Sequence, residues 1–236
     1  MPPVLGGAKE GSMEAATVQR RDPTRGAGEE PIARVTSIAD PGPLGLGAFA
    51  MTTFVLSMYN ANLVNEKGVP VVLGLALAYG GLVQLLAGMW EFRTGNTFGA
   101  VAFSSFGAFW LSFWALEVFY AKSIGGNVGH SVGLYLWAWA IFTAYMTVAA
   151  MRVSGAVLLV FVLLTVTFIL LAIGATGAHK TVTHWGGYLG LATAAAAWYA
   201  SFAAVVNHTF DRVLLPVIPL RALPRRRDDG AVTGRR

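Results

Sequence analysis

Long apolar runs separated by short polar breaks dominate the middle of the chain. Between Leu44 and Asn207 only eight residues are Asp, Glu, Lys or Arg. A bilayer core about 30 Å thick needs roughly 20 apolar residues per helix, and six runs reach that length. We therefore expect an all-α membrane protein, a bundle of six transmembrane helices at 44–64, 69–90, 97–119, 132–151, 155–177 and 182–206.

The composition agrees with this pattern and excludes several protein classes. The chain is 55% hydrophobic and 12% charged, whereas a soluble domain has roughly a quarter of its residues charged. Cysteine is absent, which excludes disulfides and cysteine-ligated metals. Although the pI is about 9.7, the arginines cluster at the tail ends without interleaved aromatic residues, so we expect no nucleic-acid binding.

Positive charge is distributed unevenly between the two predicted sides of the membrane. Of the 17 Lys and Arg residues, only Lys67, Lys122 and Lys180 fall in the breaks on one side. Cytoplasmic loops carry the excess of Lys and Arg, so we expect a multi-pass protein of the cytoplasmic (inner) membrane with both termini in the cytoplasm. We expect three parts: a disordered N-tail without a signal peptide at 1–39, a six-helix domain at 40–212 and a basic C-tail at 213–236.

The start of the first helix allows two interpretations. Asp40 precedes Pro41 and Pro43, and an acidic cap followed by proline is typical of a helix N-terminus. The exposed N–H groups of such a start could also bind an anion. The Asp40 carboxylate would compete with that anion.

Several polar side chains are predicted inside the membrane. Gln84 would either join helices or line a solute pathway. Glu117 would either reach toward the outer interface or relay protons, whereas Glu91 and Arg93 are expected at the opposite membrane boundary. Other candidate substrate or pathway residues are Thr52, Asn60, Asn96, Thr97, Ser105 and Thr165.

Small residues and histidines complete the pattern. Glycines recur in the second and sixth runs, where they predict close helix contacts. The four histidines fall near predicted helix ends, which supports neither a haem nor a metal site, and no nucleotide-binding or hydrolase motif is present. We therefore expect no cofactor, no metal and no enzymatic activity. The glycines are Gly74, Gly80, Gly81 and Gly88, then Gly186, Gly187 and Gly190.

Three motifs resemble the acetate uptake transporter family, which includes bacterial succinate–acetate permeases and fungal acetate transporters. The resemblance covers roughly residues 40–216. The motifs are Pro41-Gly42-Pro43-Leu44-Gly45-Leu46, similar to the family's Asn-Pro-Ala-Pro-Leu-Gly-Leu signature once Asp40 is included, Gly95-Asn96-Thr97-Phe98-Gly99, and Phe106-Gly107-Ala108-Phe109-Trp110.

The resemblance implies a homohexameric ring with a separate pathway inside each six-helix protomer. It also implies a hydrophobic constriction formed by Phe49, Phe106 and Leu164. The family often has Tyr at the position of Phe106, so we expect a drier constriction in this chain. Asp40 and Gly42 replace the Asn and Ala of the signature.

The expected function is therefore transmembrane transport of acetate or a related small mono- or dicarboxylate such as succinate. Proton-coupled symport and channel-like anion permeation both fit, and the expected partners are the carboxylate, protons and the lipid bilayer. The alternatives are a small-solute or ammonium channel, which would need a cation-attracting vestibule, and a structural membrane subunit without a pathway.

Overall fold

Six membrane-length helices make up the bundle, which confirms the predicted fold class. The computed structural model describes residues 38–125 and 128–220, so the predicted N-tail lies almost wholly outside the described residues. The spans are Gly42–Asn60, Pro70–Thr94, Thr97–Ile124, Val128–Ala150, Gly155–Thr176 and Lys180–Thr209.

Two of the spans contain a π-helical turn. The elements in chain order are α1 (Gly42–Asn60), η1 (Glu66–Gly68), α2 (Pro70–Leu77), η2 (Ala78–Val83), α3 (Gln84–Thr94), α4 (Thr97–Ala115), η3 (Leu116–Tyr120), α5 (Ala121–Ile124), α6 (Val128–Ala150), α7 (Gly155–Thr176) and α8 (Lys180–Thr209). The second span is thus α2, η2 and α3, and the third is α4, η3 and α5. π-turns are frequent at functional sites, and η2 ends directly before Gln84.

Local signals explain where the helices begin and end. α1 starts at Gly42, two residues earlier than expected, because the prolines on either side hold backbone angles that suit a first turn. It ends at Asn60 rather than 64, since Asn62 turns into the left-handed region with φ of 57°. At the other end of the second span, Gly95 adopts φ of 77° and stops α3. Asn96 then caps α4 by accepting a hydrogen bond from Gly99 N at 3.1 Å.

Glycines allow the predicted close helix contacts. A Cβ on Gly81 would lie 2.7 Å from the Leu111 side chain of α4, and one on Gly187 would collide with the α1 backbone at Asn60 and Ala61. Gly74 is the exception, since a Cβ there would meet no atom within 4 Å. Close packing of this kind holds helices together in a membrane, where lipid is as apolar as the helices themselves.

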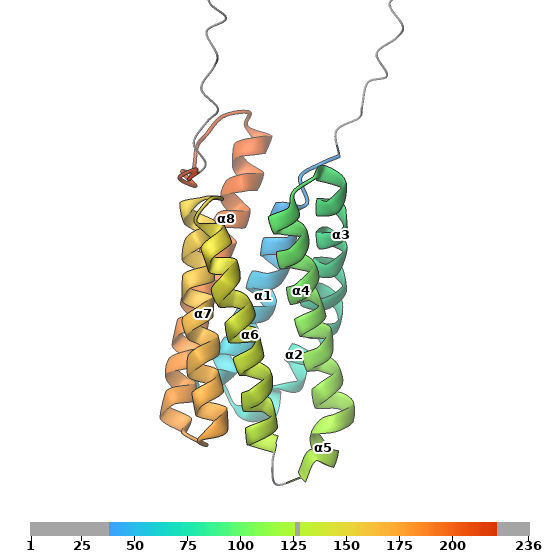
Figure 1. Ribbon diagram of the computed structural model, residues 1–236, viewed down its shortest axis with the longest axis vertical. Helices are drawn as coiled ribbons and strands as arrows, with labels where there is room; N and C mark the ends of the chain where they lie inside the picture. Colours follow the sequence, from blue (N-terminus) through green and yellow to red (C-terminus); the bar gives the residue numbers. More distant parts are fainter. Residues whose placement is uncertain (1–37, 126–127, 221–236) are drawn as a thin grey trace, which may run out of the picture. The chain divides into compact units, whose positions relative to one another are not determined.

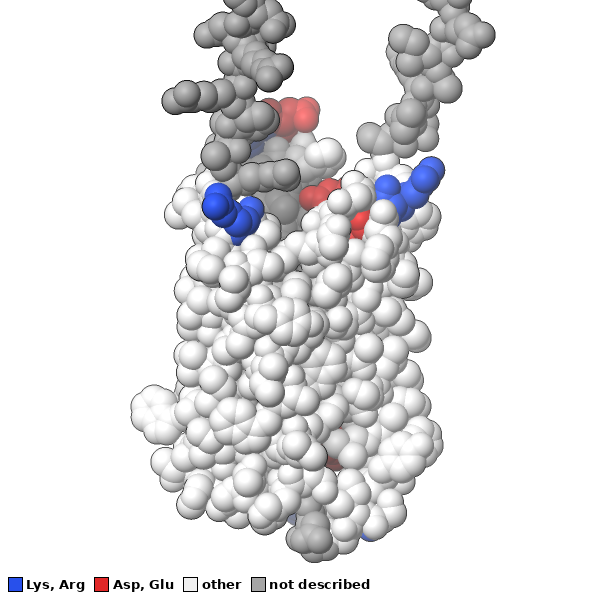
Figure 2. Space-filling view, viewed as in Figure 1, with Lys and Arg blue, Asp and Glu red and all other residues white. Residues whose placement is uncertain are grey.

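The helices lie side by side with both described chain ends at the same end of the bundle (Figure 1). We call this the terminal end and the opposite one the distal end. α8 packs against α1 and α7, α6 packs against α7, and α3 packs against α4. Charged side chains gather mainly at the terminal end of the face in Figure 2, above a broad uncharged band. Such a band suits contact with lipid.

Residues 213–220 fold back over the terminal end. Asn207 holds them: its Oδ1 accepts hydrogen bonds from Leu214 N at 2.7 Å and Leu215 N at 3.0 Å, and its Nδ2 donates to Leu215 O at 2.8 Å. Farther along, Gly155 N donates to Ile218 O at 2.8 Å. We call residues 213–220 the terminal strap. Part of the predicted C-tail therefore packs on the bundle, while 221–236 lie outside the described residues.

Replacing Asn207 with Ala should loosen the terminal strap. Three hydrogen bonds are lost, and at about 0.5–1.5 kcal/mol each the strap should lose about 1–3 kcal/mol of stability against local opening. Amide hydrogen exchange at Leu214 and Leu215 should then quicken by about tenfold or more. The exposed neighbour His208, replaced by Ala, is the matched control. Unchanged exchange in Asn207→Ala would show that these bonds do not hold the strap.

Candidate functional site

Two cavities lie along the inside of the single protomer. The first, the terminal vestibule, has a volume of about 230 Å³ and is lined from Asp40 and Glu91 at the terminal end to Phe49 and Leu164 in the middle. The second, the distal vestibule, has a volume of about 340 Å³ and is lined from Phe49 and Leu164 to Asn60 and Glu117. Phe49 and Leu164 line both cavities, so the two vestibules meet at these side chains.

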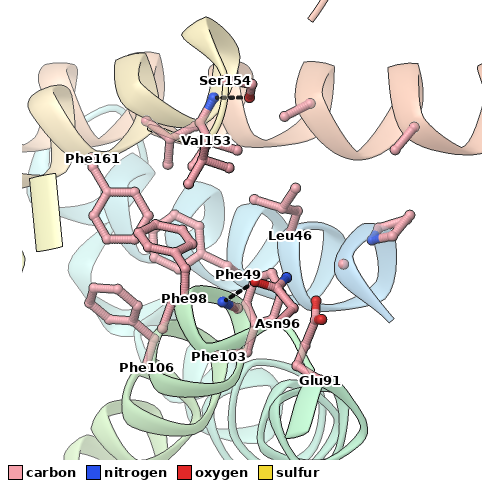
Figure 3. A pocket seen from close by; sticks show the side chains of 18 of the residues that line it. Leu46, Phe49, Glu91, Asn96, Phe98, Phe103, Phe106, Val153, Ser154 and Phe161 are labelled. Atoms are coloured by element: carbon pink, nitrogen blue, oxygen red, sulfur yellow. Dashed lines mark hydrogen bonds between the residues drawn. The ribbon is translucent and has the colours of Figure 1, made fainter. Parts of the chain in front are cut away.

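Phe106 completes an aromatic cluster at this boundary. Its ring centre lies 5.7 Å from that of Phe49, 6.0 Å from that of Phe161 and 6.5 Å from that of Phe168. Figure 3 shows the rings of Phe49, Phe98, Phe106 and Phe161 gathered on one side of the terminal vestibule. Phe49, Phe106 and Leu164 are each at most 4% exposed. The structure thus brings the three predicted constriction residues together from α1, α4 and α7.

Carboxyl groups occupy the helix starts at the terminal end. Asp40 Oδ1 accepts a hydrogen bond from Gly42 N at 2.8 Å, which fills the start of α1. Glu91 Oε2 accepts from Thr94 Oγ1 at 3.1 Å. The Asn96 side chain lies close by, since a Cβ on Gly99 would be 2.6 Å from Asn96 Nδ2 and 2.7 Å from Glu91 Oε1. The two signature prolines have different environments: Pro43 lines the terminal vestibule, and Pro41 is buried without lining it.

The burial of Glu91 differs from the sequence expectation. The sequence pattern predicts Glu91 at the membrane boundary, but its side chain is only 2% exposed and lines the terminal vestibule. Arg93, two residues later, is exposed. The difference arises because Glu91 turns inward beneath the start of α4, where a Cβ on Gly99 would lie 2.7 Å from its Oε1. Only a glycine leaves room for the carboxyl group there.

Residues with unpaired polar atoms line both vestibules. Gln84 is 1% exposed, lines the terminal vestibule, and its Oε1 has no hydrogen-bond partner among the described residues. Thr53 and Trp110 line the distal vestibule, and Thr53 Oγ1 and Trp110 Nε1 are likewise unpaired within the described chain. Buried polar atoms are normally hydrogen-bonded, so these atoms are the candidate contacts for water or a solute in the vestibules.

Other candidate polar residues divide between the vestibules and the helix contacts. Asn96 lines the terminal vestibule, and Asn60 and Glu117 line the distal one. Thr52, Thr97, Ser105 and Thr165 line neither. Thr52 Oγ1 donates to Ala48 O at 2.9 Å, and Thr165 Oγ1 lies 2.9 Å from Thr147 Oγ1 on α6.

Thr53 and Thr167 line the distal vestibule, whereas Thr52 and Thr165, the candidates chosen from the same two helices, line neither vestibule. A signal for both exists in the sequence. Residues four apart share a helix face, so Thr53 follows Phe49, and Thr167 lies one turn from Leu164. Of the remaining signature residues, Leu44 is exposed on the surface of the bundle, whereas Gly45 serves the packing, since a Cβ there would lie 2.7 Å from the Phe103 ring.

The chain matches a known protein family over most of its length. The model of the GPR1/FUN34/yaaH family matches residues 27–222. The chain belongs to this family. The resemblance inferred from the sequence motifs is thereby confirmed.

Members of the GPR1/FUN34/yaaH family similar to this chain include named transport proteins. Ammonia transport outward protein 2 of Saccharomyces cerevisiae is 44% identical over 189 residues, which cover 78% of this chain and 67% of that protein. The succinate-acetate/proton symporter SatP of Escherichia coli K12 is 36% identical over 183 residues, covering 77% and 96%. The solved structure of the bacterial acetate channel SatP matches with a TM-score of 0.71 at 36% identity, covering 77% of this chain and 99% of that one.

Proposed function

We propose that this chain transports acetate or a related small carboxylate such as succinate across a membrane, without enzymatic activity. The observation that carries the proposal is the pair of vestibules that meet at Phe49 and Leu164 inside one protomer. The names of the similar proteins supply the substrate class. Proton symport and channel-like permeation are both compatible with this arrangement.

Phe49, Phe106 and Leu164 would act as the constriction. Apolar side chains at a narrow point exclude water and so control passage. A carboxylate or its neutral acid would leave most of its hydration in one vestibule, pass the three apolar side chains and regain polar contacts in the other. On the distal side, the Thr53 hydroxyl and the Trp110 Nε1–H can donate to a carboxylate. On the terminal side, Gln84 Oε1 can accept a hydrogen bond only from the O–H of the neutral acid. Phe106 lacks a hydroxyl, so it adds no hydrogen bond at the constriction.

We propose the inner membrane as the location, with the terminal end in the cytoplasm. Arg93, Arg152 and Arg212 lie at the terminal end, whereas Lys67, Lys122 and Lys180 lie at the distal end, and this difference supports the orientation. We also propose the homohexameric ring that the family resemblance implies. Because one protomer already contains both vestibules, the pathway would run within each copy rather than between copies.

Ammonium is the second candidate substrate. The terminal vestibule is lined by Asp40 and Glu91, and its described lining residues include no Lys or Arg. A similar protein also bears the name ammonia transport outward protein 2. A cavity with acidic groups and no basic ones attracts a cation, as an ammonium pathway requires.

The test is voltage-driven uptake of radiolabelled acetate and succinate into proteoliposomes, with ammonium in parallel. Protein-free vesicles correct for acetic acid that crosses lipid unaided, and succinate dianion crosses bare lipid poorly. Carboxylate uptake above that background is the expected result, and its dependence on a pH gradient separates symport from channel conduction. Ammonium uptake without carboxylate uptake, in protein that is shown to be folded, would replace the first proposal by the second.

A further inference from the structure

The terminal vestibule has an electrostatic property that the proposed function does not explain. Asp40 is exposed and lines the vestibule where it opens at the terminal end. The Glu91 carboxyl group lies near the same point, since a Cβ on Gly42 would be 3.0 Å from Asp40 Oδ1 and 3.5 Å from Glu91 Oε1. Two carboxyl groups therefore flank one point of the vestibule wall.

The donors that could hold a substrate carboxylate there are already in use. Gly42 N, at the start of α1, donates to Asp40, and the Thr94 hydroxyl donates to Glu91. At the start of α4, Gly99 N donates to the Asn96 side chain. Helix starts would otherwise favour an anion. An incoming carboxylate thus meets occupied donors and a negative charge.

The opposite opening has a different charge. A cavity at the distal end shares Tyr59 and Asn60 with the distal vestibule, and its lining includes Lys180 and no Asp or Glu among the described residues. The distal vestibule itself is lined by Glu117, so the distal side carries one acid and one Lys. The terminal vestibule is lined by two acids and, among the described residues, by no Lys or Arg, which makes the terminal side the more negative of the two.

We infer that Asp40 is a charge-selectivity residue, which hinders carboxylate anions at the terminal mouth and leaves the neutral acid unaffected. This inference rests on the proposed function, because it concerns the charge form in which the carboxylate crosses. A unit charge several ångströms from the path costs an anion free energy that falls with salt concentration. A neutral acid meets no such cost. The unpaired Gln84 Oε1 in the same vestibule can accept a hydrogen bond from the acid's O–H.

The test compares Asp40→Asn with the wild type in voltage-driven acetate uptake at constant pH. Asparagine keeps the Oδ1 acceptor that holds Gly42 N, and it caps helices as well as aspartate does, so the fold should be retained. At low ionic strength the initial rate per amount of protein should rise about threefold to tenfold. At about 1 M salt, where the screening length is about 3 Å, the ratio of variant to wild type should approach one.

Asp211→Asn is the matched control. Asp211 is another exposed acid near the terminal end, but it does not line the vestibule. Because the interaction between two charges falls with their separation, its removal should change the rate far less than the removal of the Asp40 charge does. An unchanged rate in Asp40→Asn, a rise that persists at high salt, or an equal rise in Asp211→Asn would each overturn the inference.

The wild-type measurement separates this inference from the proposed function. Wild-type carboxylate uptake with no effect of Asp40→Asn would leave the function standing and reject the charge-selectivity role. Uptake that appears only in Asp40→Asn would support that role. Absence of uptake in both proteins would overturn the role and the proposed carboxylate transport together.

Discussion

Replacing Phe106 with Ala should raise voltage-driven succinate uptake by about tenfold or more. An apolar passage discriminates between solutes of different size by about 1–3 kcal/mol, and a rate change of this magnitude falls in that range. The Phe106 ring is 3% exposed and packs on Phe49 at the boundary of the two vestibules. Its removal would join them through a wider opening. The larger dianion should gain more than acetate, so the ratio of succinate to acetate uptake should also rise.

Phe54→Ala is the matched control for this prediction. Phe54 lies on α1 and packs on Trp198 of α8 with ring centres 5.1 Å apart, but it lines neither vestibule. Its loss should lower thermal stability by the ordinary cost of a lost core ring and leave the succinate-to-acetate ratio unchanged. If folded Phe106→Ala protein transports both solutes as the wild type does, Phe106 has no part in the constriction.

The six helices could be predicted from the sequence alone, since the thickness of the membrane sets their length and contact with lipid sets their apolar composition. The residues of the proposed constriction were also predicted from the sequence, but only through the family resemblance. Phe49, Phe106 and Leu164 come from three helices, and no spacing within one helix reveals which faces will meet. The structure supplies that meeting, with Phe49 and Phe106 in contact.

Polar pathway residues were harder to predict for the same reason. Thr52 and Thr53 are neighbours in the chain, yet a helix turns by about 100° per residue, and only Thr53 faces a vestibule. Thr52 packs instead where Gly80 leaves room for it. The burial of Glu91 was not predicted, because its neighbours Gly42 and Gly99 come beside it only once α1 and α4 start side by side. An acid near a helix end looks like an interface residue until that packing is known.

Replacing Gly187 with Ala should destabilise the bundle strongly for the addition of a single methyl group. A Cβ at this position would collide with the α1 backbone at Asn60 and Ala61, and backbone atoms cannot rotate away as a side chain can. The overpacking should cost about 1–3 kcal/mol, which corresponds to a fall in thermal midpoint of about 3–10 °C for a chain of this size. The measurement is thermal unfolding in mild detergent.

Ala substitutions at two further glycines, Gly190 and Gly74, should cost less stability than Gly187→Ala. A Cβ on Gly190 of α8 would meet the Ser57 hydroxyl, a side chain that can turn aside, so Gly190→Ala should cost less than Gly187→Ala. Gly74→Ala meets no atom within 4 Å and replaces glycine in a helix interior, so it should be neutral or stabilise by up to about 1 kcal/mol. Since the three changes add the same methyl group, a common loss of stability would show that helix propensity or lipid contact matters more than packing. The predicted order would show that the distance between the α1 and α8 backbones sets the stability.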